Sequence, residues 1–324
     1  MMRRTWKFGL GLLGLLAAGT AFSQAQESAP IPADDKVTPE EFDVELGRLA
    51  ERMTVPVEVA GSGPYHFVVD TGAERTVISR ALADQLKLQP GRPVTMHSMG
   101  GVDRVDTVRI PHLELNAKSV SDIDAPALNE AYLGAKGMLG VDTLQSQRVT
   151  FDFEKKTMSI APSREARRRT GSGNDIIVTA RSRFGRLVLV DASLDGQKVW
   201  VIVDTGSDAT IGNSVLRRKL EKKHRLGQTF PVELISVMGE RVAADQAVAR
   251  ELELGGVTMT GMPVAFADVP PFAKLDLEDK PALLLGMDAL RTFSRVSVDF
   301  AERRVRFLLP DVSQVRDRTM LAKR

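Results

Sequence analysis

The tripeptide Asp-Thr-Gly occurs twice in the chain, at Asp70–Gly72 and at Asp204–Gly206, and each copy follows a short apolar stretch. Such a stretch is typical of a buried strand, and Gly permits a sharp turn with close backbone approach directly after it. A carboxylate at the end of a buried strand is costly unless it has hydrogen-bond partners or a chemical role. Two carboxylates a few ångströms apart cannot both ionise, so one can act as a general base and the other as a general acid. Such a pair can activate water against an amide carbonyl without a metal, Ser or Cys.

The two tripeptides belong to a larger internal repeat. The aligned blocks are Phe67–Ile78 with Val201–Gly212, Met138–Leu144 with Leu284–Leu290, and Arg148–Phe153 with Arg295–Phe300. Three blocks in one order with nearly constant spacing indicate two copies of one domain. We therefore expect an all-β protein with two homologous lobes, related by a pseudo-two-fold axis, and an active site between them. One Asp-Thr-Gly alone could be a strand-to-turn element, but two symmetric copies favour a catalytic pair.

Local patterns predict further elements around these motifs. Short helices are expected near Ser79–Leu86 and Asn213–Lys222, each opened by a residue type that caps helices. Asp142 and Asp288 are interpreted as structural residues that cap helices rather than as catalytic groups. Two further acidic residues, Asp152 and Asp299, alternate with apolar residues on predicted strands and are expected to face solvent.

Composition excludes several classes of protein. The 324 residues include no Cys, which excludes a disulfide scaffold, a thiolate zinc site, an iron–sulfur cluster and a cysteine nucleophile. The four His do not form an H-E-x-x-H motif, which argues against a metalloprotease. A formal net charge of +2 gives no electrostatic case for nucleic-acid binding. We expect no metal and no cofactor, a polypeptide substrate as the partner, and a monomer.

The N-terminus has the pattern of an export signal. Residues 1–7 carry Arg3, Arg4 and Lys7, an uncharged apolar run follows, and small residues come next, so 1–25 is predicted to be a signal peptide. The apolar run is short for a membrane span, so we expect an exported, periplasmic or secreted protein with no stable membrane insertion. A retained anchor stays an alternative, and the choice between Sec and twin-arginine export stays open. Removing residues 1–25 changes the formal charge from +2 to −1.

The remaining chain divides by composition. The predicted segments are a flexible N-terminal arm at 26–50, lobe 1 at 51–162, a basic Gly/Ser linker at 163–185, lobe 2 at 186–310 and a C-terminal tail at 311–324. Whether the arm acts as a pro-segment is left open.

At its two Asp-Thr-Gly motifs the chain resembles the aspartic proteases, and more closely the retropepsin-like group of bacteria, over about residues 53–162 and 186–310. Each lobe resembles one retropepsin subunit, with both subunits fused in one chain. The resemblance implies that Asp70 and Asp204 are catalytic and that Thr71 and Thr205 brace the two loops against each other. It also implies loop-supporting positions, which are Gly72, Ala73, Gly140, Gly206, Ser207 and Gly286.

The resemblance further implies that a hairpin flap covers the cleft in each lobe. Candidate flap residues are Met99, Gly100, Gly101, Met238 and Gly239, which combine apolar side chains with glycine. The flap tyrosine of pepsin-type enzymes is absent, since Tyr65 and Tyr132 lie outside both hairpins. The two motifs differ in their fourth residue, and we hypothesise that Ser207 donates to Asp204 and keeps the shared charge mainly there.

Two functions are compatible with these features. The first is an exported aspartic endopeptidase that hydrolyses peptide bonds with water activated by Asp70 and Asp204. The alternative is a catalytically inactive peptide-binding protein of the same fold. The presence of both Asp residues favours the enzyme.

Overall fold

The computed structural model describes residues 53–115, 118–163, 175–183, 186–189 and 191–310. The predicted signal segment at 1–25, the arm at 26–50 and the tail at 311–324 lie outside the described residues. No helix within the described ranges is long and apolar enough to cross a lipid bilayer.

Lobe 1 is built mainly from strands, as predicted. Its elements are β1 (Thr54–Val59), β2 (Ser62–Val69), β3 (Val77–Ser79), α2 (Arg80–Gln85), β4 (Gln89–Pro90), β5 (Val94–His97), β6 (Val102–Val105), β7 (Thr107–Leu115), β8 (Lys118–Leu128), α3 (Glu130–Leu133), β9 (Gly137–Leu139), α4 (Val141–Leu144), β10 (Gln147–Asp152) and β11 (Thr157–Pro162). Seven strands follow the order β1-β2-β9-β3-β8-β7-β4, and an additional pairing of β1 with β7 closes the sheet. Buried Phe67, Ile78 and Leu113 belong to the core of this lobe.

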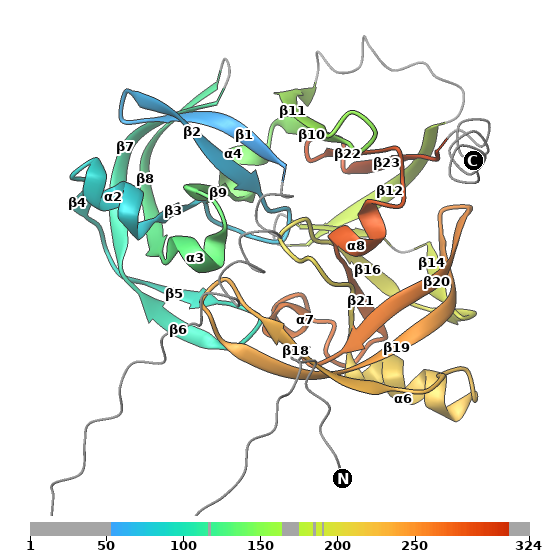
Figure 1. The fold of residues 1–324 in the computed structure, drawn as a ribbon. Helices are drawn as coiled ribbons and strands as arrows, with labels where there is room; N and C mark the ends of the chain where they lie inside the picture. Colours follow the sequence, from blue (N-terminus) through green and yellow to red (C-terminus); the bar gives the residue numbers. More distant parts are fainter. Residues whose placement is uncertain (1–52, 116–117, 164–174, 184–185, 190, 311–324) are drawn as a thin grey trace, which may run out of the picture. The chain divides into compact units, whose positions relative to one another are not determined.

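Lobe 2 repeats the arrangement (Figure 1). Its elements are β12 (Asp175–Arg183), β13 (Arg186–Leu189), β14 (Ala192–Leu194), β15 (Gln197–Lys198), β16 (Trp200–Val203), β17 (Ile211–Gly212), α6 (Ser214–Lys222), β18 (Phe230–Ile235), β19 (Arg241–Leu254), β20 (Val257–Phe266), α7 (Pro270–Lys274), β21 (Ala282–Leu285), α8 (Met287–Leu290), β22 (Arg295–Asp299) and β23 (Arg304–Leu308). In lobe 1, β9 lies between β2, to which it is parallel, and β3. In lobe 2, β21 lies in the same way between β16 and β17. The predicted all-β class with two homologous lobes is thereby confirmed.

The two predicted helices begin at their capping residues. The Oγ of Ser79 accepts from the backbone N–H of Leu82 at 3.1 Å at the start of α2. The Oδ1 of Asn213 accepts from the N–H of Leu216 at 2.9 Å at the start of α6. Each cap satisfies a donor that the first helical turn would otherwise leave unpaired.

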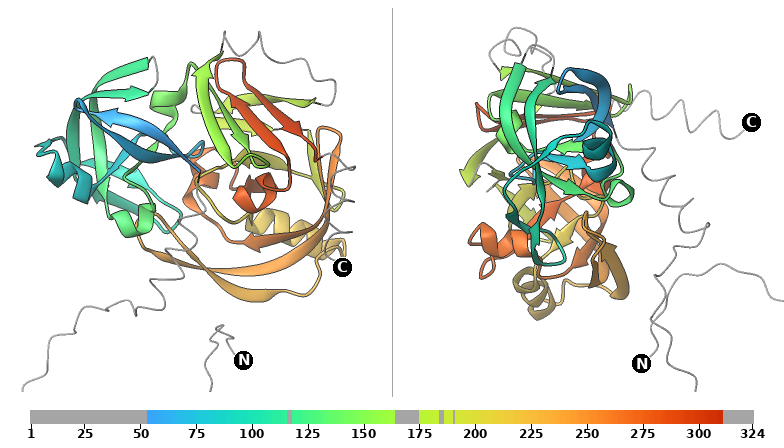
Figure 2. Two further views of the ribbon diagram at one scale, coloured as in Figure 1. Left: turned by 45° about the horizontal axis from the view of Figure 1, so that its top comes forward. Right: turned by 90° about the vertical axis from the view of Figure 1, so that its left-hand side faces the viewer.

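Antiparallel strands from both lobes form one sheet. Strand β10 of lobe 1 pairs with β22 of lobe 2, and β11 and β23 extend the sheet on either side. Figures 1 and 2 show these green and red strands side by side. The register places Arg148 opposite Asp299 and Asp152 opposite Arg295. There are thus two equivalent Arg–Asp pairs, and in each pair one lobe supplies the Arg and the other lobe supplies the Asp.

The prediction that Asp152 and Asp299 face solvent is wrong. Asp152 is 8% exposed and Asp299 is 1% exposed. The Asp299 carboxylate accepts from Nε and Nη2 of the buried Arg148 at 3.0 Å each, and from the hydroxyl of Ser163. Asp152 accepts from Arg295 Nη2 at 2.9 Å. The alternation of apolar and polar residues predicted one solvent-facing side for these strands, but both of their faces are covered where the lobes meet.

The predicted C-terminal boundary of the linker, residue 185, lies too far along the chain. Residues 175–183 form strand β12, which pairs with β23 and β13 rather than leaving the sheet. Residues 164–174 lie outside the described residues. The prediction rested on basic and Gly/Ser-rich composition, but the apolar residues Ile176–Val178 belong to a strand of lobe 2.

Candidate active site

Both Asp-Thr-Gly motifs lie in loops that follow directly after a buried strand. Asp70 follows β2 and Asp204 follows β16, and each residue is 9% exposed. The backbone N–H of Asp70 donates to Leu139 O at 3.0 Å, and that of Asp204 donates to Leu285 O at 3.0 Å. Each aspartate is therefore held by the strand that lies beside its own, β9 in lobe 1 and β21 in lobe 2.

The two loops approach each other through their glycines. A Cβ added to Gly72 would lie 2.6 Å from Oδ1 of Asp204, and a Cβ added to Gly206 would overlap the carboxylate of Asp70. Each carboxylate therefore lies against the backbone of the other lobe's loop. Only glycine leaves room for this approach, which brings two ionisable groups from positions 134 residues apart into one site.

Thr71 and Thr205 connect the loops by reciprocal hydrogen bonds. The Thr71 hydroxyl donates to Val203 O at 2.8 Å, and the Thr205 hydroxyl donates to Val69 O at 2.7 Å. Each hydroxyl also accepts from the other threonine's backbone N–H at 3.1 Å. All four groups are buried, so each bond satisfies a backbone group that water cannot reach.

Backbone donors point at both carboxylates. Asp70 Oδ1 accepts from the N–H groups of Gly72 and Ala73 at 2.7 and 3.0 Å. Asp204 Oδ1 accepts from Gly206 N–H at 3.0 Å. Hydrogen bonds of this kind favour the ionised form of a carboxyl group.

The hypothesis that Ser207 donates to Asp204 is wrong. The Ser207 hydroxyl donates instead to Ala209 O at 2.7 Å. A hydroxyl has one hydrogen to donate, and here the carbonyl oxygen of Ala209 in the same loop accepts it. The proposed localisation of the charge on Asp204 therefore loses its basis.

A second pair of loops supports the first. Gly140 N–H donates to the Thr76 hydroxyl, and Gly286 N–H donates to the Thr210 hydroxyl, both at 3.2 Å. Each of these threonine hydroxyls in turn donates to a carboxylate, Thr76 to Asp142 at 2.8 Å and Thr210 to Asp288 at 2.6 Å.

Asp142 and Asp288 thus have the structural role that was predicted, but they are not helix caps. The N-caps of α4 and α8 are Gly140 and Gly286, and each aspartate lies in the first turn of its helix. The sequence interpretation missed Thr76 and Thr210. The signal was present, since both lie six residues after the Asp of their motif.

The candidate flap residues lie at the tips of two hairpins. Met99, Gly100 and Gly101 lie in the β5–β6 turn, and Met238 and Gly239 lie in the β18–β19 turn. Met99 packs on the apolar cluster of lobe 2 that contains Ile202 and Leu284, whereas Val237 and Met238 pack on the cluster of lobe 1 that contains Val77 and Met138. Each flap tip therefore contacts the opposite lobe.

A carboxylate that the sequence interpretation missed joins the two tips. Glu240 Oε2 accepts from the hydroxyl of Ser236 in its own turn at 2.8 Å and from the hydroxyl of Ser98 in the other flap. Ser98 also accepts from the N–H groups of Gly100 and Gly101 at 3.1 Å each. Glu240 thus forms a hydrogen-bonded bridge between the flaps.

The hollow between the flaps and the aspartates is small. It measures about 120 Å³, and its lining includes Asp70, Asp204, Met96, Met138, Val237 and Lys274. Sites for organic ligands typically measure about 300–1,000 Å³. A ligand of the usual size therefore requires the flaps to move apart before it can lie over the carboxylates.

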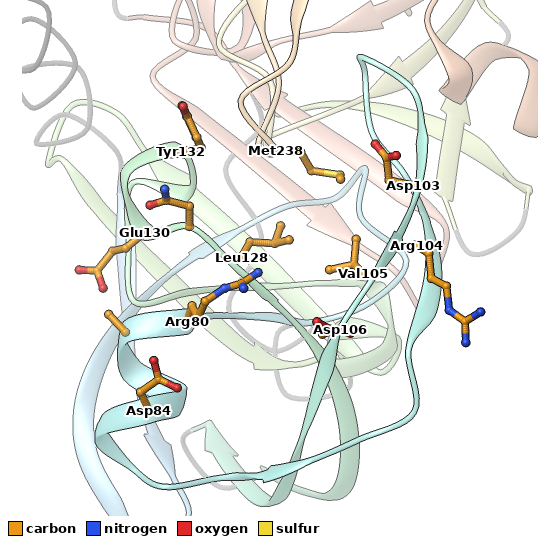
Figure 3. A pocket seen from close by; sticks show the side chains of 12 residues that line it. Arg80, Asp84, Asp103, Arg104, Val105, Asp106, Leu128, Glu130, Tyr132 and Met238 are labelled. Carbon is orange, nitrogen blue, oxygen red and sulfur yellow. The ribbon is translucent and has the colours of Figure 1, made fainter. Parts of the chain in front are cut away.

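A larger hollow of about 880 Å³ lies beside lobe 1 and contains neither aspartate of the motifs (Figure 3). Leu128, Val105 and Met238 lie between charged side chains that include Asp84 and Arg104. Because Met238 lies at a flap tip, this hollow borders the cleft without forming part of it. Across the described ranges of the chain, no three His, Asp or Glu side chains are grouped so that they could hold a metal ion.

Comparison with protein families identifies both lobes. Residues 55–146 match the model of the family described as "gag-polyprotein putative aspartyl protease", and residues 190–289 match the family described as "Aspartyl protease". Each match includes one Asp-Thr-Gly loop and the supporting Gly downstream of it. The comparison with curated proteins gave no match.

Proposed function

Because the chain belongs to the retropepsin-like aspartic protease family, we propose that it is an endopeptidase in which Asp70 and Asp204 activate one water molecule. The observation that carries this proposal is the close approach of the two loops, in which Gly72 lies against Asp204 and Gly206 against Asp70. Two carboxylates held in this way share one proton at moderate pH.

The chemistry follows from that shared proton. The ionised carboxylate removes a proton from water as the water oxygen bonds to the carbonyl carbon of the scissile amide, while the protonated carboxyl donates to the carbonyl oxygen. The first carboxyl then gives its proton to the amide nitrogen and the second removes a proton from one hydroxyl of the tetrahedral intermediate, so the C–N bond breaks and the pair again shares one proton. The threonine bridge holds both carboxylates in place before substrate arrives, so little reorganisation is needed when charge develops. The flaps exclude bulk water once a peptide is bound.

The test is hydrolysis of an unfolded protein and of a quenched-fluorescence peptide library by the chain from residue 26 onward. We expect cleavage that a statine-type inhibitor blocks, with a bell-shaped dependence of kcat/KM on pH. Asp70→Asn and Asp204→Asn keep the shape of the side chain and should each lower kcat/KM by at least about 10²–10⁴-fold. Asp84→Asn, an exposed carboxylate outside the cleft, is the matched control.

The outcome separates the enzyme from the alternative of an inactive peptide-binding protein. Full activity in either Asn variant would exclude the assigned pair of aspartates. Peptide binding without any cleavage by the wild-type chain would favour the binding protein.

We also propose that the protein is exported and acts as a monomer, because both halves of the site lie in one chain. The basic and then apolar segment at 1–25 supports export. Intact-mass analysis of the protein from its native cell should find a chain that starts after Ser23 or Ala25. A chain that still starts at Met1 and sediments with membranes would favour a retained anchor.

A further inference from the structure

The cleft carries charged side chains besides the two aspartates. Glu74, Arg75 and Lys274 line the same hollow as Asp70 and Asp204. Lys274 of α7 reaches across from lobe 2 and pairs with Glu74 at 2.8 Å. These two opposite charges offset each other, so the Glu74–Lys274 pair adds little net charge to the cleft.

Arg75, unlike Glu74 and Lys274, has no charged partner among the residues that the structure describes. Its side chain is exposed, and within the described part of the chain its guanidinium makes no ion pair or hydrogen bond. Its backbone is fixed, since a Cβ on Gly140 would overlap the main chain of Arg75. A guanidinium keeps its charge at every pH in use and offers five N–H donors in a planar fork. The cleft therefore holds a positive charge on a side chain whose backbone is anchored and whose donors are available.

Lobe 2 has no basic residue at the position equivalent to Arg75. The internal repeat aligns Glu74 with Asp208 and Arg75 with Ala209. A peptide stretched across the two aspartates thus meets the unpaired guanidinium of Arg75 beside one aspartate, whereas the equivalent position of lobe 2 carries only the methyl group of Ala209. The two sides of the cleft are chemically different although the backbone repeats.

We propose that Arg75 selects peptides that carry Asp or Glu on the lobe-1 side of the scissile bond. The proposal rests on the proposed peptidase function and names a preference of that same site. Carboxylate and guanidinium can form two parallel N–H···O bonds, which gives the pair geometric as well as electrostatic selectivity. The pairing also fixes the direction in which a peptide lies in a cleft whose backbone is nearly symmetric.

The experiment compares peptides that differ only by Glu or Gln at one position, scanned over three residues on each side of the cleaved bond. At one position we expect kcat/KM to be about 3- to 10-fold higher for Glu at pH 6 and low salt. The ratio should fall as salt is raised, because the site is open to solvent. Arg75→Gln should bring the ratio to about 1, and Arg75→Glu should favour Lys at that position. Arg218→Gln on α6 removes an exposed Arg outside the cleft and should leave the ratio unchanged.

A second measurement separates this inference from the proposed function. Fluorescence polarisation measures binding of the same labelled peptides to Asp204→Asn at pH 6. A Glu preference in binding that disappears with Arg75→Gln supports the inference even if no peptide is cleaved, an outcome that would overturn the peptidase proposal. Cleavage with equal rates for Glu and Gln at every position would overturn the inference alone. A preference that survives Arg75→Gln would also overturn it, and peptides neither bound nor cleaved would refute both proposals.

Discussion

Replacing Thr71 by Val tests whether the threonine bridge holds the two lobes together. The substitution keeps the branched shape of the side chain and removes its hydroxyl. Val203 O then loses its donor at 2.8 Å, and Thr205 N–H loses its acceptor at 3.1 Å. Both residues are buried, so water does not replace the lost partners.

The expected loss of stability follows from these two groups. A buried polar group left without a partner costs about 1–3 kcal/mol, so the two groups together should lower the free energy of unfolding of Thr71→Val by about 2–6 kcal/mol. Thr71→Ser keeps the hydroxyl and loses one methyl group, which costs about 0.8 kcal/mol. The more apolar variant is thus expected to be the less stable one, the reverse of what burial of apolar area alone predicts.

Urea unfolding followed by far-UV circular dichroism measures both values. Thr205→Val should show a loss of similar size, and the double Val variant should lose less than the sum because both hydroxyls belong to one bridge. If Thr71→Val is as stable as Thr71→Ser, the hydroxyl does not stabilise the contact between the lobes and the reasoning fails.

Three further perturbations test other parts of the site. Gly206→Ala places a methyl group on the Asp70 carboxylate and should lower kcat/KM by about 10²-fold. Gly227→Ala, where a Cβ would meet open space, should leave kcat/KM unchanged. Equal kcat/KM values for the two variants would contradict the close approach of the two Asp-Thr-Gly loops. Glu240→Ala removes the bridge between the flaps and should speed hydrogen exchange at Gly100 and Gly101 by roughly 5- to 10-fold; an unchanged rate would show that the bridge does not hold the tips. Burial raises the pKa of Asp152, but hydrogen bonds from Lys155 N–H and Arg295 outweigh it, so that pKa lies below its ordinary value of 3.8. The resulting stability is present above about pH 3.8 and is lost as pH falls through the lowered pKa. Asp152→Asn should therefore cost about 0.2–1 kcal/mol at pH 6 and progressively less below pH 3.8, and a cost that grows on acidification would exclude this account.

The features that the sequence predicted correctly depend on neighbours along the chain. An apolar stretch followed by Asp-Thr-Gly implies a buried strand and a tight loop, and the caps Ser79 and Asn213 act within three residues of themselves. The duplication was visible because the repeated blocks keep their order and spacing. Two lobes and two candidate aspartates could therefore be predicted without knowledge of the tertiary structure.

The features that the sequence left open or misplaced depend on strand register and on contacts between the lobes. Asp299 is buried because β10 lies beside β22, and that register brings Arg148 to its carboxylate across 151 residues. The partner of Ser207 was decided by the turn of its loop, and the partners of Glu240 by where the two flap tips meet. The sequence by itself determined which residues could do chemistry, since local geometry follows from adjacent residues. Only the tertiary structure decided which charges are paired, because pairing depends on side chains that the fold brings together from distant positions.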